Sequence, residues 1–214
     1  MATTDEHRIE TAETLRELIG TPGDLASRKV MTRIDVHARD FIARSPFLCL
    51  SSADASGRAD VTPRGDPPGF VRVLDETTIA IPDRPGNNRL DTMSNILANP
   101  NVGVLFFVPG FEDMLRINGR AWLSRDPAIL SVAAVNGKTP KLAICVRVDE
   151  LFFHCAKALK RSHLWDPTSR LDRRSMPSLA QIILEQTAGG AKVAENELAK
   201  ADARLEESYR TRLY

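Results

Sequence analysis

The segment of residues 79–109 constrains the fold more than any other part of the chain. It starts with a short β-branched run that ends at Pro82, because proline has no N–H to donate to a β-ladder. A turn follows, and apolar residues three and four apart then predict a helix over residues 90–98. The nearly continuous apolar run over residues 102–108 is typical of a buried strand. The segment therefore predicts a strand, a turn, a short helix and a strand, in that order.

The turn of residues 83–89, called the basic turn below, has the composition of a phosphate-binding site. It reads Asp-Arg-Pro-Gly-Asn-Asn-Arg, and Arg84 and Arg89 flank the predicted start of the helix. A helix N-terminus leaves unpaired N–H groups that attract anions, and a guanidinium binds phosphate oxygens in bidentate fashion. We expect Asn87 or Asn88 to be the helix N-cap. The spacing is equally compatible with a solvated loop that has two surface arginines.

Composition excludes several classes of protein. The 214 residues suit one domain with a helical appendage, and 29 basic against 28 acidic residues leave a net charge of +1. This balance gives no reason to expect a nucleic-acid partner or binding to a membrane surface. The apolar runs are far shorter than the ~20 residues that span a bilayer. The polar N-terminal residues do not have the pattern of a signal peptide.

The cysteines and histidines do not form a metal or disulfide pattern. Cys49, Cys145 and Cys155 are an odd number without paired spacing, which indicates a reducing compartment and a cytoplasmic protein. Cys49 and Cys145 lie among apolar residues and are expected to be buried. His154 and Cys155 are residue types that bind zinc, but no second pair follows at ligand spacing, so no metal site is predicted.

The remaining elements follow from the same periodicities. Strands are predicted over residues 47–50, 59–62, 70–74, 78–81, 114–123 and 141–148. Helices are predicted over residues 9–20, 30–45, 124–135, 178–187 and 191–214, with one or two helical turns over 155–164. Residues 63–69 are expected to form a rigid loop, and Gly189-Gly190 a hinge. About six strands with few helices predict a mainly β, α+β fold whose antiparallel sheet closes on itself.

Four motifs in this order suggest a family. They are Asp60-Val-Thr-Pro-Arg-Gly-Asp-Pro-Pro-Gly, Ile81-Pro-Asp-Arg-Pro-Gly-Asn-Asn-Arg-Leu-Asp, Asn99-Pro-Asn-Val-Gly-Val-Leu-Phe-Phe-Val-Pro-Gly and Leu115-Arg-Ile-Asn-Gly-Arg-Ala. Over roughly residues 40–167 the chain resembles the pyridoxamine 5′-phosphate oxidase-like flavoproteins. The tail, residues 154–165, is similar to one uncharacterised branch of that superfamily. The resemblance implies an antiparallel split β-barrel of the FMN-binding type, in a homodimer with two FMN sites at the subunit interface.

The resemblance also implies a division of the chain. Residues 1–45 would be N-terminal helices that pack on the barrel, residues 46–167 the FMN-binding barrel, and residues 168–214 a C-terminal helical extension. The last helix has a thin apolar stripe and needs a neighbour, which another subunit could supply.

The resemblance carries over to particular residues. Asn87-Asn88-Arg89 resembles the Ser-Arg-Lys element that holds the FMN phosphate in the oxidase, with Arg84 replacing the lost charge. Pro63-Arg64-Gly65 would lie along the isoalloxazine ring. Asp83 and Asp91 bracket the basic turn and would orient an arginine or cap the helix. The segment with Lys157, Arg161, Ser162 and Trp165 resembles the one that reaches the flavin, from the same subunit or from its partner.

Two departures from the family pattern bear on the reaction. Met114 lies where the oxidase has a flavin-contacting glutamine, and the C-terminal Arg and His motif that binds the pyridoxal substrate has no equivalent here. True pyridoxamine phosphate oxidase activity is therefore not expected.

Three functions stay open at this stage. The first is an FMN-dependent oxidoreductase that acts on a small-molecule substrate or electron donor; its catalytic residues are unknown, because the cofactor does the electron chemistry. The second is a non-catalytic flavin carrier. The third is a haem-binding split barrel with His154 or His163 as the axial ligand.

Overall fold

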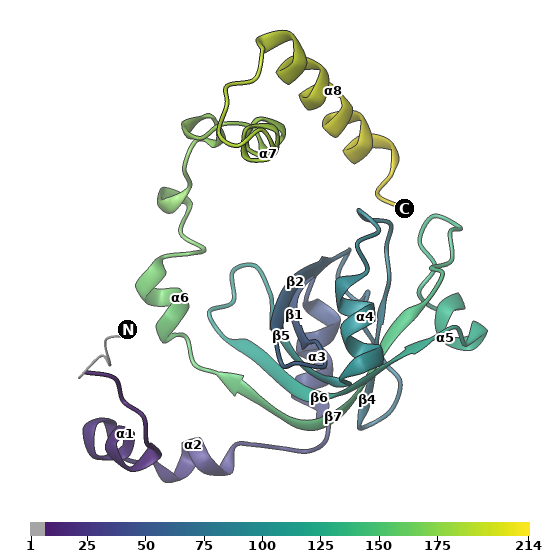
Figure 1. Ribbon diagram of the computed structural model, residues 1–214. Coiled ribbons are helices and arrows are strands. Elements are labelled where there is room, and N and C mark those ends of the chain that lie inside the picture. The colour runs from purple at the N-terminus through teal and green to yellow at the C-terminus, as the bar shows by residue number, and fades with distance from the viewer. Residues whose placement is uncertain (1–6) are drawn as a thin grey trace.

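A computed structural model describes residues 7–214 (Figure 1). The polar N-terminal residues 1–6, on which the expectation of no signal peptide depends, lie outside the described residues. A 7-stranded antiparallel sheet in the order β2-β1-β5-β6-β7-β4-β3 forms the centre of the molecule. Its strands are β1 (Phe47–Ala53), β2 (Ala59–Gly65), β3 (Arg72–Val73), β4 (Thr78–Pro82), β5 (Asn101–Phe107), β6 (Met114–Ser124) and β7 (Ala143–His154).

The sheet does not close on itself. Its edge strands β2 and β3 pair only with β1 and β4, respectively, so the predicted closure is wrong. β3 is the shortest strand, with two residues in place of the predicted five. The segment Pro67-Pro68-Gly69 comes just before the predicted strand and delays its start. The α+β class and the antiparallel split-barrel architecture are confirmed.

The core explains why these segments are strands. β1 and β5 alternate buried and partly exposed residues, so Leu48, Leu50, Val104 and Phe106 face inward. β4 is buried along its whole length. Its neighbour β7 continues to His154, although the apolar run that predicts it ends at residue 148. The extension pairs with β6 past a bulge at Asn118/Gly119.

Gly119 is required at this bulge. A Cβ at this position would collide with the backbone carbonyl of Arg147 on β7, so no other residue fits without moving the strand. The long β6–β7 pair that results is the main support for the short strands β4 and β3.

Helix α3 (Val36–Arg44) packs on the core. Its N-cap Asp35 accepts a hydrogen bond from the N–H of Ala38 at 2.8 Å, and Ala38, Phe41 and Ile42 are buried. The helix therefore starts later than predicted. Met31, which was expected to be helical, instead pairs with Leu151 of β7.

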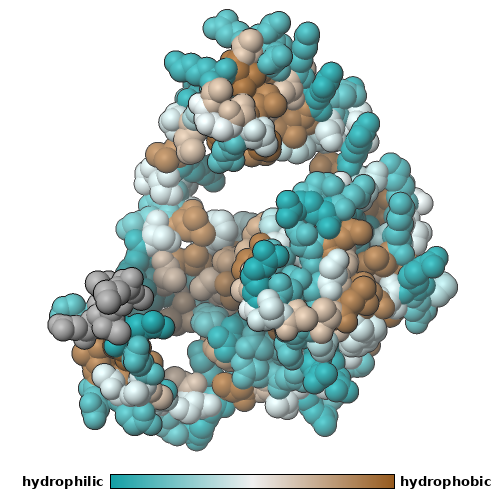
Figure 2. All heavy atoms as spheres, in the orientation of Figure 1, coloured by the Kyte–Doolittle hydropathy of each residue, from teal (hydrophilic) through white to brown (hydrophobic). Residues whose placement is uncertain are grey.

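The other helices are α1 (Ala12–Ile19), α2 (Asp24–Arg28), α4 (Asp91–Ala98), α5 (Pro127–Ser131), α6 (Lys157–Ser162), α7 (Leu179–Thr187) and α8 (Glu195–Thr211), with short 3₁₀ turns at Pro167–Ser169 and Arg173–Ser175. No residue of α1, α2 or α8 is buried, and these helices stand away from the sheet (Figure 1). Figure 2 shows apolar side chains exposed around α1 and on the α7–α8 pair. Among the described residues, no helix is long and apolar enough to cross a bilayer.

Candidate functional site

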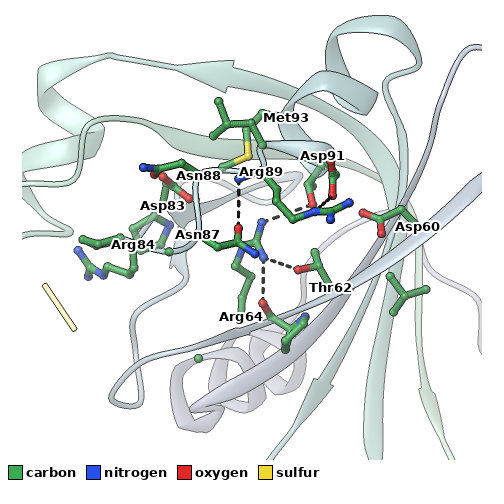
Figure 3. A pocket seen from close by; sticks show the side chains of 18 of the residues that line it. Asp60, Thr62, Arg64, Asp83, Arg84, Asn87, Asn88, Arg89, Asp91 and Met93 are labelled. Carbon is green, nitrogen blue, oxygen red and sulfur yellow. Dashed lines mark hydrogen bonds and ion pairs between the residues drawn. The ribbon is translucent and has the colours of Figure 1, made fainter. Parts of the chain in front are cut away.

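A pocket of about 410 Å³ lies between β2 and the basic turn (Figure 3). The first residues of α4 and the ring of Phe70 complete its lining. Its size is within the range of small-molecule and cofactor sites. The pocket brings together the predicted residues Pro63, Arg64, Gly65, Asp83, Arg84, Asn87, Asn88 and Arg89.

Arg64 points into this pocket because it belongs to a strand. Residues 63–65, predicted to begin a loop, are the end of β2, since an edge strand tolerates proline. Thr62 and Arg64 are half-buried on the inner face, whereas Pro63 and Gly65 face outward. The predicted loop therefore starts at Asp66, and strand alternation sets the direction of the Arg64 side chain.

The guanidinium of Arg64 has neutral hydrogen-bond partners only. One terminal nitrogen donates to Thr62 Oγ1 at 2.7 Å and to the carbonyl of Pro63 at 2.9 Å. The other lies 3.5 Å from Thr92 Oγ1, at the start of α4. Burial lowers the pKa of Arg64, against the charges of Asp83 and Asp60. No described carboxylate lies within ion-pair distance of this partly buried cation, so it is well placed to accept an anion.

The N-terminus of α4 has no side-chain cap. The predicted caps Asn87 and Asn88 are wrong: the N-cap is Leu90, in a left-handed conformation with φ 61°. Asn87 Oδ1 instead accepts a hydrogen bond from the N–H of Arg89 at 3.1 Å within the basic turn, and Asn88 is also left-handed, with φ 58°. A left-handed leucine costs about 1–3 kcal/mol, and such strain tends to occur at functional sites. The first-turn residues of α4, whose N–H groups have no acceptor within the helix, line the pocket.

Arg89 lies at the exposed mouth of the pocket. Its Nε forms an ion pair with Asp91 Oδ2 at 2.8 Å, and the two side chains are 72% and 49% exposed. The hydrogen bond from Arg89 to Asp91 raises the pKa of the guanidinium. Asp91 thus orients an arginine, one of the two roles expected for it, and it would compete with a bound anion for Arg89.

Arg84 is directed away from the pocket interior (Figure 3). Its Nε pairs with Asp66 Oδ2 at 2.6 Å, and a terminal nitrogen donates to the carbonyl of Ala133 at 2.9 Å. The side chains of Arg84 and Asp66 are only 16% and 1% exposed. The guanidinium expected to replace a phosphate charge is therefore engaged by a buried carboxylate.

Asp83 is a carboxylate inside the pocket. Burial raises the pKa of Asp83, and the nearby charges of Arg64 and Arg84 oppose that rise. Sequence reasoning missed Asp60, Thr62, Phe70, Thr92 and Met93, which also line the pocket. The period-2 alternation that places Arg64 would also have found Thr62, and the predicted helix start would have found Thr92.

The remaining predicted residues do not line the pocket of this chain. Lys157, Arg161 and Ser162 are on α6, and Trp165 follows it. Trp165 Nε1 donates to the carbonyl of Phe111 at 2.7 Å, and Ser162 Oγ donates to the carbonyl of Leu159 at 3.1 Å. Their predicted contact with a flavin stays a prediction.

His154 lies elsewhere, at the end of β7. It lines a separate, open hollow of about 280 Å³ together with Cys49, Leu105 and Arg116, and its ring is tilted by 51° to that of Phe152, with centroids 5.0 Å apart. Burial lowers the pKa of His154, and the charges of Arg116 and Lys29 add to this effect. In residues 7–214 no three His, Cys, Asp or Glu side chains are grouped so that they could hold a metal ion. Cys145 is buried as predicted, whereas Cys49 is only partly buried.

The split barrel and its pocket define the class of the protein, and comparison with known families identifies the family to which it belongs. The family model described as pyridoxamine 5′-phosphate oxidase matches residues 34–155, more than half of the chain. The chain belongs to this family. No curated protein is significantly similar to it.

Several solved structures are similar to part of this chain at low sequence identity. HupZ of Group A Streptococcus is 19% identical, with a TM-score of 0.48 over 57% of this chain and 95% of that one. The haem storage protein HutZ of Vibrio cholerae is 14% identical, with a TM-score of 0.40 over 57% and 94%. An FMN-binding protein of Syntrophomonas wolfei is 14% identical, with a TM-score of 0.40 over 54% and 82%.

Proposed function

We propose that this chain binds FMN, with the phosphate between Arg64, the N-terminus of α4 and Arg89. The observation that carries the proposal is Arg64, a partly buried guanidinium that has no ion-pair partner in residues 7–214 and contacts Thr92 at an uncapped helix N-terminus. A cation and open N–H groups that converge on one point favour a phosphate over a neutral ligand. Arg84 is left out of this set because Asp66 and Ala133 occupy its guanidinium.

The pocket offers room for the rest of the cofactor. Its lining continues from the phosphate end along the backbone of residues 63–65 to the ring of Phe70. When bound, FMN would supply the transfer of electrons to or from a small-molecule substrate. The chain itself would anchor the phosphate, orient the ring and exclude water. We therefore propose an oxidoreductase without an obligatory catalytic side chain.

The proposed working unit is a homodimer in the cytoplasm. On the sheet face opposite the core, Phe47 is 40% exposed and its ring lies 6.1 Å from that of Phe107. Such an aromatic surface favours contact with a second copy. The partner's α6 segment would then bring Lys157, Arg161, Ser162 and Trp165 to the flavin. The three free cysteines fit a reducing compartment.

The test is the absorbance spectrum of the purified protein, followed by FMN titration of arginine variants. Arg64→Ala should weaken FMN binding about tenfold to a hundredfold, because one charge-assisted phosphate contact is worth about 1.5–3 kcal/mol. Arg89→Ala should weaken it less, because Arg89 is exposed to water. Arg39→Ala, an exposed arginine on α3, is the matched control and should change nothing. Wild-type protein that ignores FMN would contradict the proposal.

A haem-binding function is the second candidate, and His154 favours it. Its lowered pKa favours the neutral imidazole, the form that an axial ligand must have, and it lines an open hollow that no residue of the basic turn lines. The same spectrum separates the two functions, since haem gives an intense Soret band and flavin does not. Haem binding would be lost in His154→Ala and retained in Arg64→Ala.

A flavin carrier is separated from an enzyme by kinetics. An enzyme should let a chemical or nicotinamide donor reduce its bound FMN faster than free FMN, because the ring is held beside a substrate cleft. A carrier should make this reduction slower or leave it unchanged.

A further inference from the structure

The C-terminal extension, residues 168–214, is attached to the barrel at its far end. Figures 1 and 2 show α7 and α8 standing clear of the sheet, with the segment after α8 lying beside the basic turn. α8 has no buried residue. Among the described residues of the extension, Tyr214 alone hydrogen-bonds to residues 34–155. The hydrogen bonds between the described residues of the extension and residues 34–155 are therefore concentrated at one residue.

Tyr214 meets three separate parts of the barrel. Its hydroxyl donates to Asp66 Oδ1 at 2.6 Å, just after β2. Lys138, in the turn before β7, donates from Nζ to the backbone oxygen of Tyr214 at 2.8 Å. The guanidinium carbon of Arg84 lies 5.5 Å from the centroid of the Tyr214 ring, within cation–π range.

Asp66 connects Tyr214 to the pocket. Its other oxygen, Oδ2, is the one paired with Arg84, so a single buried carboxylate accepts from both the tyrosine and the arginine. Arg84 is the residue after Asp83 in the basic turn, and Asp66 follows the strand that carries Arg64. The cluster thus joins the two walls of the pocket from behind. Hydrogen bonds to a buried carboxylate are electrostatically stronger than the same bonds in water.

We propose that Tyr214 has two roles. It is a positioning residue for the pocket, and it is the clasp of the C-terminal extension, that is, the residue whose hydrogen bonds hold the extension against the barrel. By donating to Asp66 it holds the carboxylate in the orientation that fixes Arg84, and Arg84 in turn holds the basic turn in the shape that leaves the α4 N-terminus open. Occupation of the pocket and docking of the extension are then coupled, and each strengthens the other. The coupling to FMN rests on the function proposed above; the docking does not.

The titration of the cluster is consistent with this arrangement. The hydrogen bond to Asp66 raises the pKa of the Tyr214 phenol, and burial adds to the rise. The charged groups that face the phenol are Asp66 and Arg84, whereas Lys138 contacts the backbone oxygen of Tyr214. Across the neutral range the phenol therefore keeps the proton that it donates to Asp66.

The chain has a matched control, because it has only two tyrosines. Tyr209 lies on α8 of the same extension and is 47% exposed, and its hydroxyl makes no hydrogen bond to another described residue. The experiment compares Tyr214→Phe with Tyr209→Phe by two readouts. One is hydrogen exchange of α8 amides, measured with and without saturating FMN. The other is FMN affinity.

If Tyr214 is the clasp, Tyr214→Phe should speed exchange in α8 at least tenfold, while Tyr209→Phe leaves it unchanged. FMN should slow α8 exchange in the wild type and not in Tyr214→Phe. Tyr214→Phe should also weaken FMN binding by the same factor by which FMN slows exchange in the wild type, because coupling between two sites is reciprocal.

Each other outcome decides against part of the proposal. Equal exchange in all three proteins would overturn the clasp. Faster exchange in Tyr214→Phe with unchanged FMN affinity would overturn the positioning role and leave a purely mechanical attachment. If the wild type does not bind FMN, the proposed function fails, yet the exchange of the apo-proteins still decides on the clasp.

Discussion

The pocket interior and the cluster behind the basic turn each contain an arginine and an aspartate, and they use them differently. In the interior, Arg64 and Asp83 influence each other's charge without forming an ion pair. Behind the turn, Arg84 and Asp66 form a short ion pair that excludes water. The same residue types therefore give a guanidinium that faces a pocket without an ion pair in one place and a closed structural contact in the other. The difference lies in the partners: a carboxylate pairs with the guanidinium of Arg84, whereas the guanidinium of Arg64 donates to neutral oxygens.

The largest expected effect separates the two regions by stability. Arg84→Ala leaves the Asp66 carboxylate buried without its ion pair, which should lower the free energy of unfolding by about 3–5 kcal/mol. Arg64→Ala breaks no ion pair, and we expect a change of about 1 kcal/mol or less. Urea denaturation of both variants measures this contrast. Equal losses in the free energy of unfolding would show that both arginines are structural and would contradict the proposed difference between the two regions.

A smaller effect concerns the pH dependence of stability. Because burial raises the pKa of Asp83, the folded state holds the proton more tightly than the unfolded state. The ionised carboxylate thus costs stability at neutral pH, and this cost disappears as the pH falls through the raised pKa. Asp83→Asn should therefore stabilise the apo-protein at neutral pH, with a gain that shrinks towards about pH 4, where an ordinary aspartate titrates. Denaturation of both proteins across this range measures the gain.

Asp75 provides a control of opposite sign. Its pKa is lowered, mainly by a hydrogen bond from the backbone N–H of Thr77, so its ionised form contributes stability that is lost on acidification. Asp75→Asn should lower stability at neutral pH. If Asp83→Asn lowers stability as Asp75→Asn does, the charges of Arg64 and Arg84 outweigh the burial of the Asp83 carboxylate, and the raised pKa of Asp83 is contradicted.

The smallest expected effect is on cofactor affinity. Asp91→Asn frees Arg89 from its ion pair and removes a negative charge from the pocket mouth, so FMN should bind about two- to fivefold more tightly. The same change should cost about 0.3–1 kcal/mol of stability, because Asp91 lies in the first turn of α4, where negative charge is favourable. FMN titration and thermal unfolding measure the two effects.

The double variant Asp91→Asn with Arg89→Ala refines this test. The gain in affinity should vanish in it, because the freed arginine is gone. A gain that persists without Arg89 would mean that Asp91 acts only through repulsion of the phosphate.

Much of the fold could be predicted because its signals are local. The hairpin of β1 and β2, the helix before β5, and the strands β5 and β6 all follow from periodicity, Pro and Gly within a few residues. The boundaries that failed depend on distant partners. Met31 is not helical as predicted because it pairs with Leu151. β7 extends beyond the apolar run that predicts it because a bulge in β6 keeps the two strands paired.

The candidate site divides in the same way. The sequence by itself determined the basic turn, the helix after it and the family, because the signal for each of them lies in short runs of consecutive residues. Only the tertiary structure decided which arginine stays open to an anion. Asp66, which neutralises Arg84, comes from another strand end, and Tyr214, which completes the cluster, is 148 residues further along the chain. An ion pair forms where the fold brings two charges together and removes the water between them, and neither condition can be read from the spacing of residues along the chain.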